Sequence, residues 1–186
     1  MTPTAWAVLG LLSFGRELSG YDLKKWADNS LRFFYWSPAA SQIYSELRRL
    51  EKLGYATSTV ARQDDLRNKR VYSITETGRQ ALEAWLREPP EPTVLKHPTM
   101  LRVWLGHVEQ PDRLTKVLDA HRADLTEQLD AARHAAEHAT DDPAWGVHPA
   151  AVTRWAVRRL ESELDLLDEL ERDLATIPDP RKRFKK

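Results

Sequence analysis

The sequence has no cysteine and no long hydrophobic run, and both absences exclude whole classes of protein. Without cysteine there can be no disulfide, no thiolate metal site and no cysteine nucleophile. No apolar segment approaches the ~20 residues that a membrane-spanning helix needs. The N-terminus also shows neither the basic start nor the cleavage site of a signal peptide. We therefore expect a cytoplasmic protein that does not contact the membrane.

The residue patterns of an enzyme are missing as well. The chain has only seven glycines, and they form no phosphate-binding loop. No nucleophile–base set is recognisable, and His134 and His138, one helical turn apart, have no evident third metal ligand. The sequence predicts no enzymatic activity, no cofactor and no metal.

Charge is balanced overall but not along the chain. The 28 Lys and Arg residues match the 28 Asp and Glu residues. Through Glu88, however, 13 basic residues face 10 acidic ones, and five basic residues gather in the last six positions. The body between these regions is therefore acidic. Local patches, not the net charge, decide which partners the protein binds.

A proline-rich segment divides the chain, because three prolines between Glu88 and Pro92 cannot continue a helix. Before it, the pattern predicts three helices, a β-hairpin and a fourth helix, the order of a winged helix-turn-helix. The expected fold is mainly α with a small β-hairpin. The expected regions are a winged helix-turn-helix DNA-binding domain at 1–88, a linker at 89–97, a helical dimerisation domain, which could also hold an effector, at 98–177, and a basic tail at 178–186.

Turn and cap residues set the expected boundaries in the first region. Ser19 begins the second helix, Ser37-Pro38 begins the third and Gly54 ends it, and Thr75 begins the fourth. Trp36 is expected to pack under the third helix. The expected elements are helices at 3–13, 20–29, 38–53 and 76–86, and strands at 55–61 and 70–75 around a polar tip at 62–69.

The third helix has one apolar face and one polar, basic face. At 100° per residue, Ile43, Leu47 and Leu50 form the buried stripe. The opposite face carries small hydroxyl and basic side chains and no acid, which suits a helix in a DNA major groove. An ordinary solvated face is the alternative. The expected DNA-binding residues of this helix are Ser41, Gln42, Tyr44, Ser45, Arg48, Arg49 and Lys52.

The hairpin tip adds a second group of cations, Arg67, Lys69 and Arg70. They are expected to reach phosphates or the minor groove beside the third helix. The alternative is a solvated polar turn in which Asp64 and Asp65 pair with these same cations.

The second half predicts a short helix at 98–108 and two long amphipathic helices, at 111–139 and from about residue 149. Two such helices have too little else to bury their apolar faces, so a second copy of the chain is the expected partner. Trp104, His107, His121 and Trp155 are candidates for an effector-binding pocket, with core packing as the alternative.

Several segments resemble the PadR family of bacterial regulators, most closely its branch with a long helical C-terminal domain. They cover nearly all of the first 88 residues, in order and at family spacing. The C-terminal half is similar only in architecture. The matching segments are 9–12, 19–23, 34–38, 41–55, 70–79 and 85–86.

The resemblance implies a DNA-binding regulator, more often a repressor than an activator. It also implies a dimer formed by the C-terminal helices, DNA contacts from Tyr44 and the hairpin cations and, in some members, release from DNA by a small, often phenolic ligand. Two-fold symmetry predicts a palindromic operator with half-sites ~10 or ~20 bp apart. Leu66-Arg67-Asn68 departs from the Gly-Arg-Pro-like turn of many members. The competing hypothesis is a winged-helix protein-interaction module that does not bind DNA.

Overall fold

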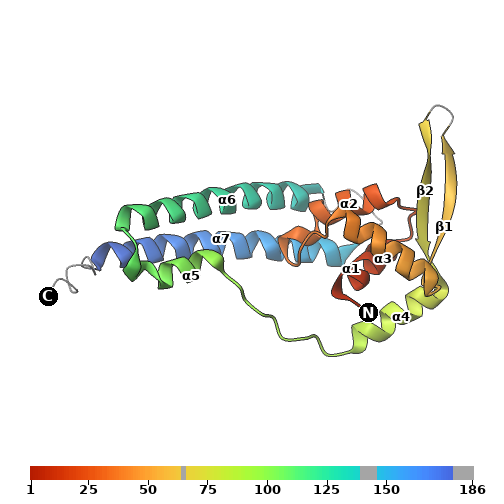
Figure 1. Cartoon of the computed structure of the whole chain (residues 1–186), viewed down its shortest axis with the longest axis horizontal. Helices are drawn as coiled ribbons and strands as arrows, with labels where there is room; N and C mark the ends of the chain where they lie inside the picture. Colours follow the sequence, from red (N-terminus) through yellow and green to blue (C-terminus); the bar gives the residue numbers. More distant parts are fainter. Residues whose placement is uncertain (64–65, 139–145, 178–186) are drawn as a thin grey trace. The chain divides into compact units, whose positions relative to one another are not determined.

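The structure, a computed structural model, describes residues 1–63, 66–138 and 146–177, without the side chains of 62, 63, 66–68 and 111. The described chain is mainly helical with one two-stranded antiparallel sheet (Figure 1), which confirms the predicted fold class. It forms two compact units. The first comprises Met1–Glu91 and His138–Val152, and the second Pro92–Glu137 and Thr153–Lys186.

Four helices and a hairpin make up most of the first unit, in the order predicted for a winged helix-turn-helix. The elements are α1 (Pro3–Leu12), α2 (Gly20–Asn29), the 3-10 turn η1 (Leu31–Phe33), α3 (Ala40–Lys52), β1 (Ala56–Gln63), β2 (Leu66–Ile74) and α4 (Glu76–Arg87). Ser19 and Thr75 cap α2 and α4 as predicted, and Gly54 follows α3 with a φ of 74° that suits glycine.

The core of the first unit lies between α1, α2 and α3. Leu9 and Leu12 of α1, Leu23 of α2 and Leu47 of α3 are all completely buried. Tyr72 of β2 belongs to the same cluster. Burying a leucine side chain contributes about 1.5–3 kcal/mol, so this cluster fixes the position of α3 against the rest of the unit.

The hairpin is longer than the sequence predicted. The polar segment 62–69, expected as a loop, belongs largely to the strands, since β1 extends to Gln63 and β2 begins at Leu66. The pairing register shifts between Ala61 and Gln63. The strands were predicted from their apolar residues, at 55–61 and 70–75, but the backbone pairing continues beyond these residues into the polar segment. Asp64 and Asp65 lie outside the described residues.

Two tryptophans of the first unit pack face to face, and a third differs from its prediction. The rings of Trp6 and Trp85 stack with centroids 5.0 Å apart, joining α1 to α4. Trp36 was predicted to pack under α3, but it is 37% exposed and instead stacks on Tyr35 at 4.0 Å. The prediction was wrong because neighbouring aromatic rings here pack on each other at the surface.

All the secondary-structure elements described in the second unit are helical. It contains α5 (Pro98–Trp104), the 3-10 turn η2 (Gly106–Val108), α6 (Pro111–His138) up to Glu137, and α7 (Val147–Thr176) from Thr153 onward. The helix predicted at 98–108 is thus interrupted at Leu105. The long helices α6 and α7 lie side by side (Figure 1). Leu118 and Leu125 of α6 and Leu160 and Leu167 of α7 are buried. None of the described helices combines the length and apolar character that crossing a membrane requires.

Candidate nucleic-acid interface

Helix α3 places its two faces as the helical periodicity predicted. Ile43, Leu47 and Leu50 are completely buried in the core of the first unit. The seven predicted DNA-binding residues of this helix are all exposed: Ser41, Gln42, Tyr44, Ser45, Arg48, Arg49 and Lys52. The buried stripe thus anchors the helix, and the polar face is left open to a ligand.

The charges on the exposed face of α3 are largely available. Arg49 lies 3.7 Å from Glu46 through Nη1 and Oε2, an i,i+3 pair that is worth little at a surface. Within the described part of the chain, neither Arg48 nor Lys52 has a carboxylate at ion-pair distance. Basic side chains without a protein partner are suited to binding phosphate or guanine.

The start of α3 differs from the prediction that Ser37 caps it and Pro38 opens it. The helix begins at Ala40, and the Oε1 of Gln42 accepts a hydrogen bond of 2.9 Å from the backbone N–H of Ala39. The Ser37 hydroxyl donates instead to Asp28 of α2. Because this hydroxyl binds Asp28, it does not cap α3. The capping pattern considers only the residues next to the helix end, so it could not predict a partner nine residues away. The side chain of Gln42 thus satisfies a backbone N–H group at the beginning of α3.

Tyr44 lies across the beginning of α2, and Gly20 makes room for it. A Cβ atom at Gly20 would come within 2.3 Å of Cε1 of the Tyr44 ring. The residue is nevertheless 43% exposed. Tyr44 is therefore a partly buried aromatic side chain near the N-terminal end of α3, the end that usually meets base edges in helix-turn-helix proteins.

The hairpin cations pair with acids elsewhere in the unit. Nζ of Lys69 lies 2.7 Å from Oδ2 of Asp22 on α2. Nη1 of Arg70 lies 3.9 Å from Oε2 of Glu51 on α3. These pairs tie β2 to α2 and α3, beside the exposed face of α3. The side chain of Arg67 lies outside the described residues.

The carboxylate of Asp22 holds both a helix cap and the hairpin. It accepts hydrogen bonds from the backbone N–H and the hydroxyl of Ser19 as well as from Lys69. Burial alone would raise the pKa of Asp22, but the hydrogen bonds from Lys69 and Ser19 outweigh it, so that the pKa lies below its ordinary value of 3.8. The stabilisation from this carboxylate is therefore present above the unfolded-state pKa and is lost as pH falls through the lower folded-state pKa.

We expect Asp22→Asn to loosen the hairpin at neutral pH, because the amide cannot form the ion pair with Lys69. The effect is modest, about 1 kcal/mol or less, since both side chains are partly exposed to solvent. Amide hydrogen exchange in β1 and β2 should become a few-fold faster. Asp28→Asn is the matched control, because Asp28 pairs with Lys24 and Ser37 and not with the hairpin. Equal acceleration in both variants would contradict the role of Asp22.

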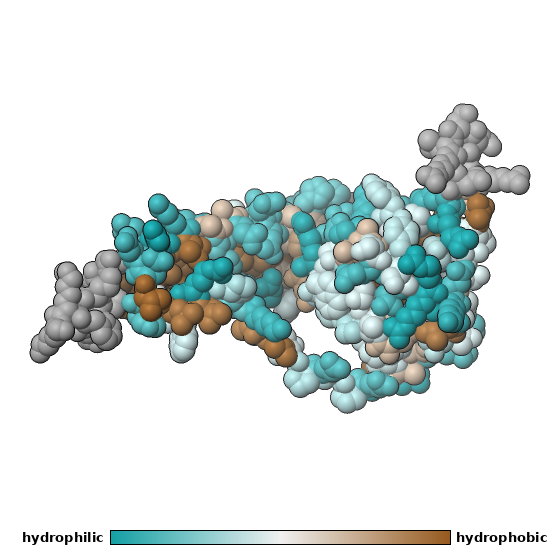
Figure 2. Space-filling view, in the orientation of Figure 1, coloured by the Kyte–Doolittle hydropathy of each residue, from teal (hydrophilic) through white to brown (hydrophobic). Residues whose placement is uncertain are grey.

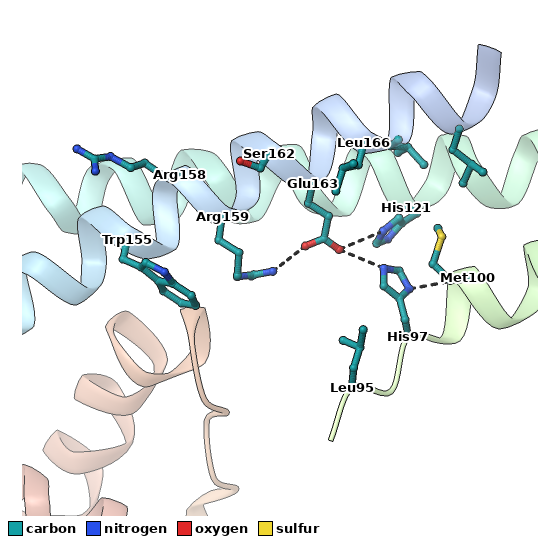
Figure 3. Close-up of a pocket in the computed structure, with 12 residues that line it drawn as sticks. Leu95, His97, Met100, His121, Trp155, Arg158, Arg159, Ser162, Glu163 and Leu166 are labelled. Atoms are coloured by element: carbon teal, nitrogen blue, oxygen red, sulfur yellow. Dashed lines mark hydrogen bonds and ion pairs between the residues drawn. The ribbon is translucent and has the colours of Figure 1, made fainter. Parts of the chain in front are cut away.

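The second unit contains a cavity of about 550 Å³ that includes two of the four predicted effector-binding residues. His121 of α6 and Trp155 of α7 line it, whereas Trp104 and His107 do not (Figure 3). Trp104 is 78% exposed. The cavity is lined by Leu95, His97, Met100, His121, Trp155, Arg158, Arg159, Ser162, Glu163, Leu166, Leu167 and Leu170.

Sequence reasoning missed the charged side of this cavity, which comprises His97, Arg159 and Glu163. The Nη1 atom of Arg159 lies 2.6 Å from Oε2 of Glu163. From the sequence, Glu163 was predicted only as part of a long amphipathic helix, and His97 as part of the linker. The sequence feature that could have drawn attention to His97 is its position directly before Pro98, where a helix can begin. In the structure His97 caps α5, and its Nδ1 accepts a hydrogen bond of 3.2 Å from the backbone N–H of Met100.

Comparison with known proteins matches this architecture to one family. The family described as "Transcriptional regulator PadR-like family" matches residues 8–84. The probable transcriptional regulator Rv1176c of Mycobacterium tuberculosis is 31% identical over 167 residues, which is 82% of this chain and 87% of that protein. The negative transcriptional regulator PadR of Bacillus subtilis is 36% identical over 127 residues, 66% of this chain and 69% of that protein.

Solved structures agree with the sequence matches. Bacillus subtilis PadR in complex with operator DNA superposes with a TM-score of 0.78 and 27% identity, covering 93% of this chain and 99% of that one. The same protein in complex with p-coumaric acid gives a TM-score of 0.69 and 25% identity, covering 91% and 97%. These proteins are regulators and not enzymes. The chain belongs to the PadR-like family of transcriptional regulators.

Proposed function

We propose that the chain is a repressor that binds a palindromic operator as a homodimer, with one α3 helix of each subunit in the major groove. The observation that carries the proposal is the exposed face of α3, where Arg48 and Lys52 lie beside Ser41 and Ser45 and no carboxylate of the described residues is at ion-pair distance from either cation. The complex of Bacillus subtilis PadR with operator DNA supports the same use of this fold. Because such a target is chromosomal, the proposal places the protein in the cytoplasm.

The hairpin contributes phosphate contacts to this proposal. Lys69 and Arg70 lie beside α3 in the free protein, paired with Asp22 and Glu51. On DNA, phosphate oxygens replace these carboxylates as partners, which releases counterions from the DNA. Arg67 belongs to the same proposed contact set by its place on β2.

Selection of bound fragments from a random DNA pool tests this function without knowledge of the operator. The expected product is a two-fold symmetric motif with half-sites ~10 or ~20 bp apart. The competing function, a protein-interaction module, predicts no enrichment at all. A folded protein that enriches no motif would therefore overturn the proposal.

The exposed apolar side chains of the second unit support the proposal that the chain dimerises through this unit. Figure 2 shows hydrophobic residues gathered along α5. Leu101 is 58% exposed, Trp104 78% and Val108 76%. Exposed apolar clusters of this kind mark association surfaces, and a second copy of the chain also supplies the two-fold symmetry that a palindrome requires.

Trp104→Ala is expected to raise the dimer dissociation constant about 30-fold or more, because a buried interface tryptophan typically contributes 2 kcal/mol or more. Sedimentation equilibrium across a protein dilution series measures this. Leu86→Ala serves as the control, since Leu86 is also exposed, at 68%, but lies on α4. If both variants dimerise as the wild type does, α5 is not the interface.

We further propose that a small aromatic acid binds the protein and releases it from DNA. The cavity of the second unit combines apolar walls, such as Trp155 and Leu166, with Arg158 and Arg159 (Figure 3). An apolar cavity with few polar groups is the usual form of a ligand site. Bacillus subtilis PadR binds p-coumaric acid. A panel of aromatic acids added to the operator complex tests this part; unchanged DNA binding at saturating ligand would contradict it.

A further inference from the structure

Three side chains from three separate elements converge at one end of the cavity in the second unit. They are His97, which caps α5, His121 of α6 and Glu163 of α7 (Figure 3). Nε2 of His97 lies 3.2 Å from Oε1 of Glu163, and Nε2 of His121 lies 3.7 Å from the same oxygen. One ligand atom from each residue lies within 4.8 Å of the other two.

We propose that His97, His121 and Glu163 form a binding site for one divalent transition-metal ion, with Zn²⁺ as the ion that fits best. Two imidazoles and one carboxylate are an established ligand set for zinc, which binds them at about 2.0–2.2 Å. Ligand atoms on one tetrahedral ion are then about 3.3 Å apart. The two distances to Oε1 of Glu163 already bracket that value. This inference goes beyond the proposed DNA binding and does not depend on it.

The surroundings of Glu163 favour coordination through a single oxygen. Nη1 of Arg159 donates to Oε2 at 2.6 Å, whereas both histidines face Oε1. Carboxylate ligands in metal sites are commonly held by such an outer hydrogen bond. All three side chains are largely shielded, with 22%, 14% and 25% of their surface exposed for His97, His121 and Glu163. In this proposal a water molecule from the cavity takes the fourth position on the ion.

The cap of α5 is the contact that metal binding changes. Nδ1 of His97 accepts from the backbone N–H of Met100, so the neutral ring carries its proton on Nε2, facing Glu163. A metal at Nε2 displaces that proton, and Nδ1 becomes the protonated atom, which cannot accept. Metal binding thus exchanges the cap for a bond to α6 and α7, at the junction where the linker enters α5.

The test uses the untagged full-length protein, stripped with EDTA and exchanged into chelator-free buffer. Calorimetric titration with Zn²⁺ is expected to show one ion per chain with a dissociation constant in the micromolar range or below. Titration with Co²⁺ should give the intense visible absorption of a four-coordinate ion. Because both are measured on the wild-type protein, neither depends on the folding of a variant.

Variants then assign the ligands. Glu163→Gln, which keeps the size of the side chain, should weaken Zn²⁺ binding by about tenfold or more. His97→Ala and His121→Ala should weaken it further, and His107→Ala, at an exposed histidine of η2, should leave it unchanged. A Zn²⁺ dissociation constant in the millimolar range for the wild-type protein would contradict the proposed metal site. The three side chains would then form a cluster around Glu163 that binds no metal. Tight binding that survives all three ligand substitutions would place the ion elsewhere and overturn it equally.

Discussion

Arg48→Ala is expected to weaken operator binding about tenfold or more without changing the fold. Arg48 is exposed on the face of α3 opposite the buried stripe, and no described carboxylate lies within ion-pair distance of it. A well-placed arginine contact to a base contributes about 1–3 kcal/mol of binding free energy, and 1.4 kcal/mol corresponds to a factor of ten. Since none of the described residues forms an ion pair with Arg48, its removal is expected to cost little stability.

The matched control for Arg48 is Arg87→Ala, which removes one positive charge from α4. Arg87 is 79% exposed and lies 3.7 Å from Glu83 in an i,i+4 pair. Fluorescence anisotropy at one fixed salt concentration compares the two variants, and far-UV circular dichroism verifies their folding. Equal affinities for folded Arg48→Ala, Arg87→Ala and wild type would show that α3 does not meet DNA through this face.

Leu47→Ala is expected to lower the free energy of unfolding of the first unit by about 2–5 kcal/mol, the usual cost of removing a buried leucine. Leu47 is completely buried and belongs to the cluster that joins α3 to α1 and α2. Domains are stable by only about 5–15 kcal/mol. The variant should therefore lose a large part of the stability that positions α3.

Leu53→Ala is the control for this substitution, because Leu53 follows the last turn of α3 and is 47% exposed. Its cost should stay below about 1 kcal/mol. Urea denaturation followed by circular dichroism measures both variants at the same protein concentration, so that dimerisation does not bias the comparison. Similar losses for Leu47→Ala and Leu53→Ala would contradict the core described here.

Local patterns in the sequence predicted the helices and the two faces of α3 well. The 3.6-residue repeat of Ile43, Leu47 and Leu50 is a property of the helix itself, and the structure buries all three. Ser19 and Thr75 were also correct caps, since each accepts from a backbone N–H only three residues ahead. Features decided within one turn of helix can be predicted from the sequence alone.

Contacts between distant segments could not be predicted in this way. The Ser37 hydroxyl donates to Asp28 on α2 instead of capping α3, and Lys69 pairs with Asp22, 47 positions away. The cluster of His97, His121 and Glu163 spans 66 residues of sequence. None of these partners shares a helical face or a strand register, so only the packed structure brings them together.

The most direct test of the account is the salt dependence of operator binding, measured by fluorescence anisotropy on a fragment obtained by the DNA selection. Six to ten phosphate contacts from α3 and the hairpin of both subunits predict that affinity falls roughly 10³–10⁵-fold between about 50 and 200 mM salt. The slope should be shallower for Lys69→Ala, by about one phosphate contact in each subunit. A nearly flat response from folded, dimeric protein would contradict the central claim that this PadR-like regulator binds DNA through α3 and the hairpin.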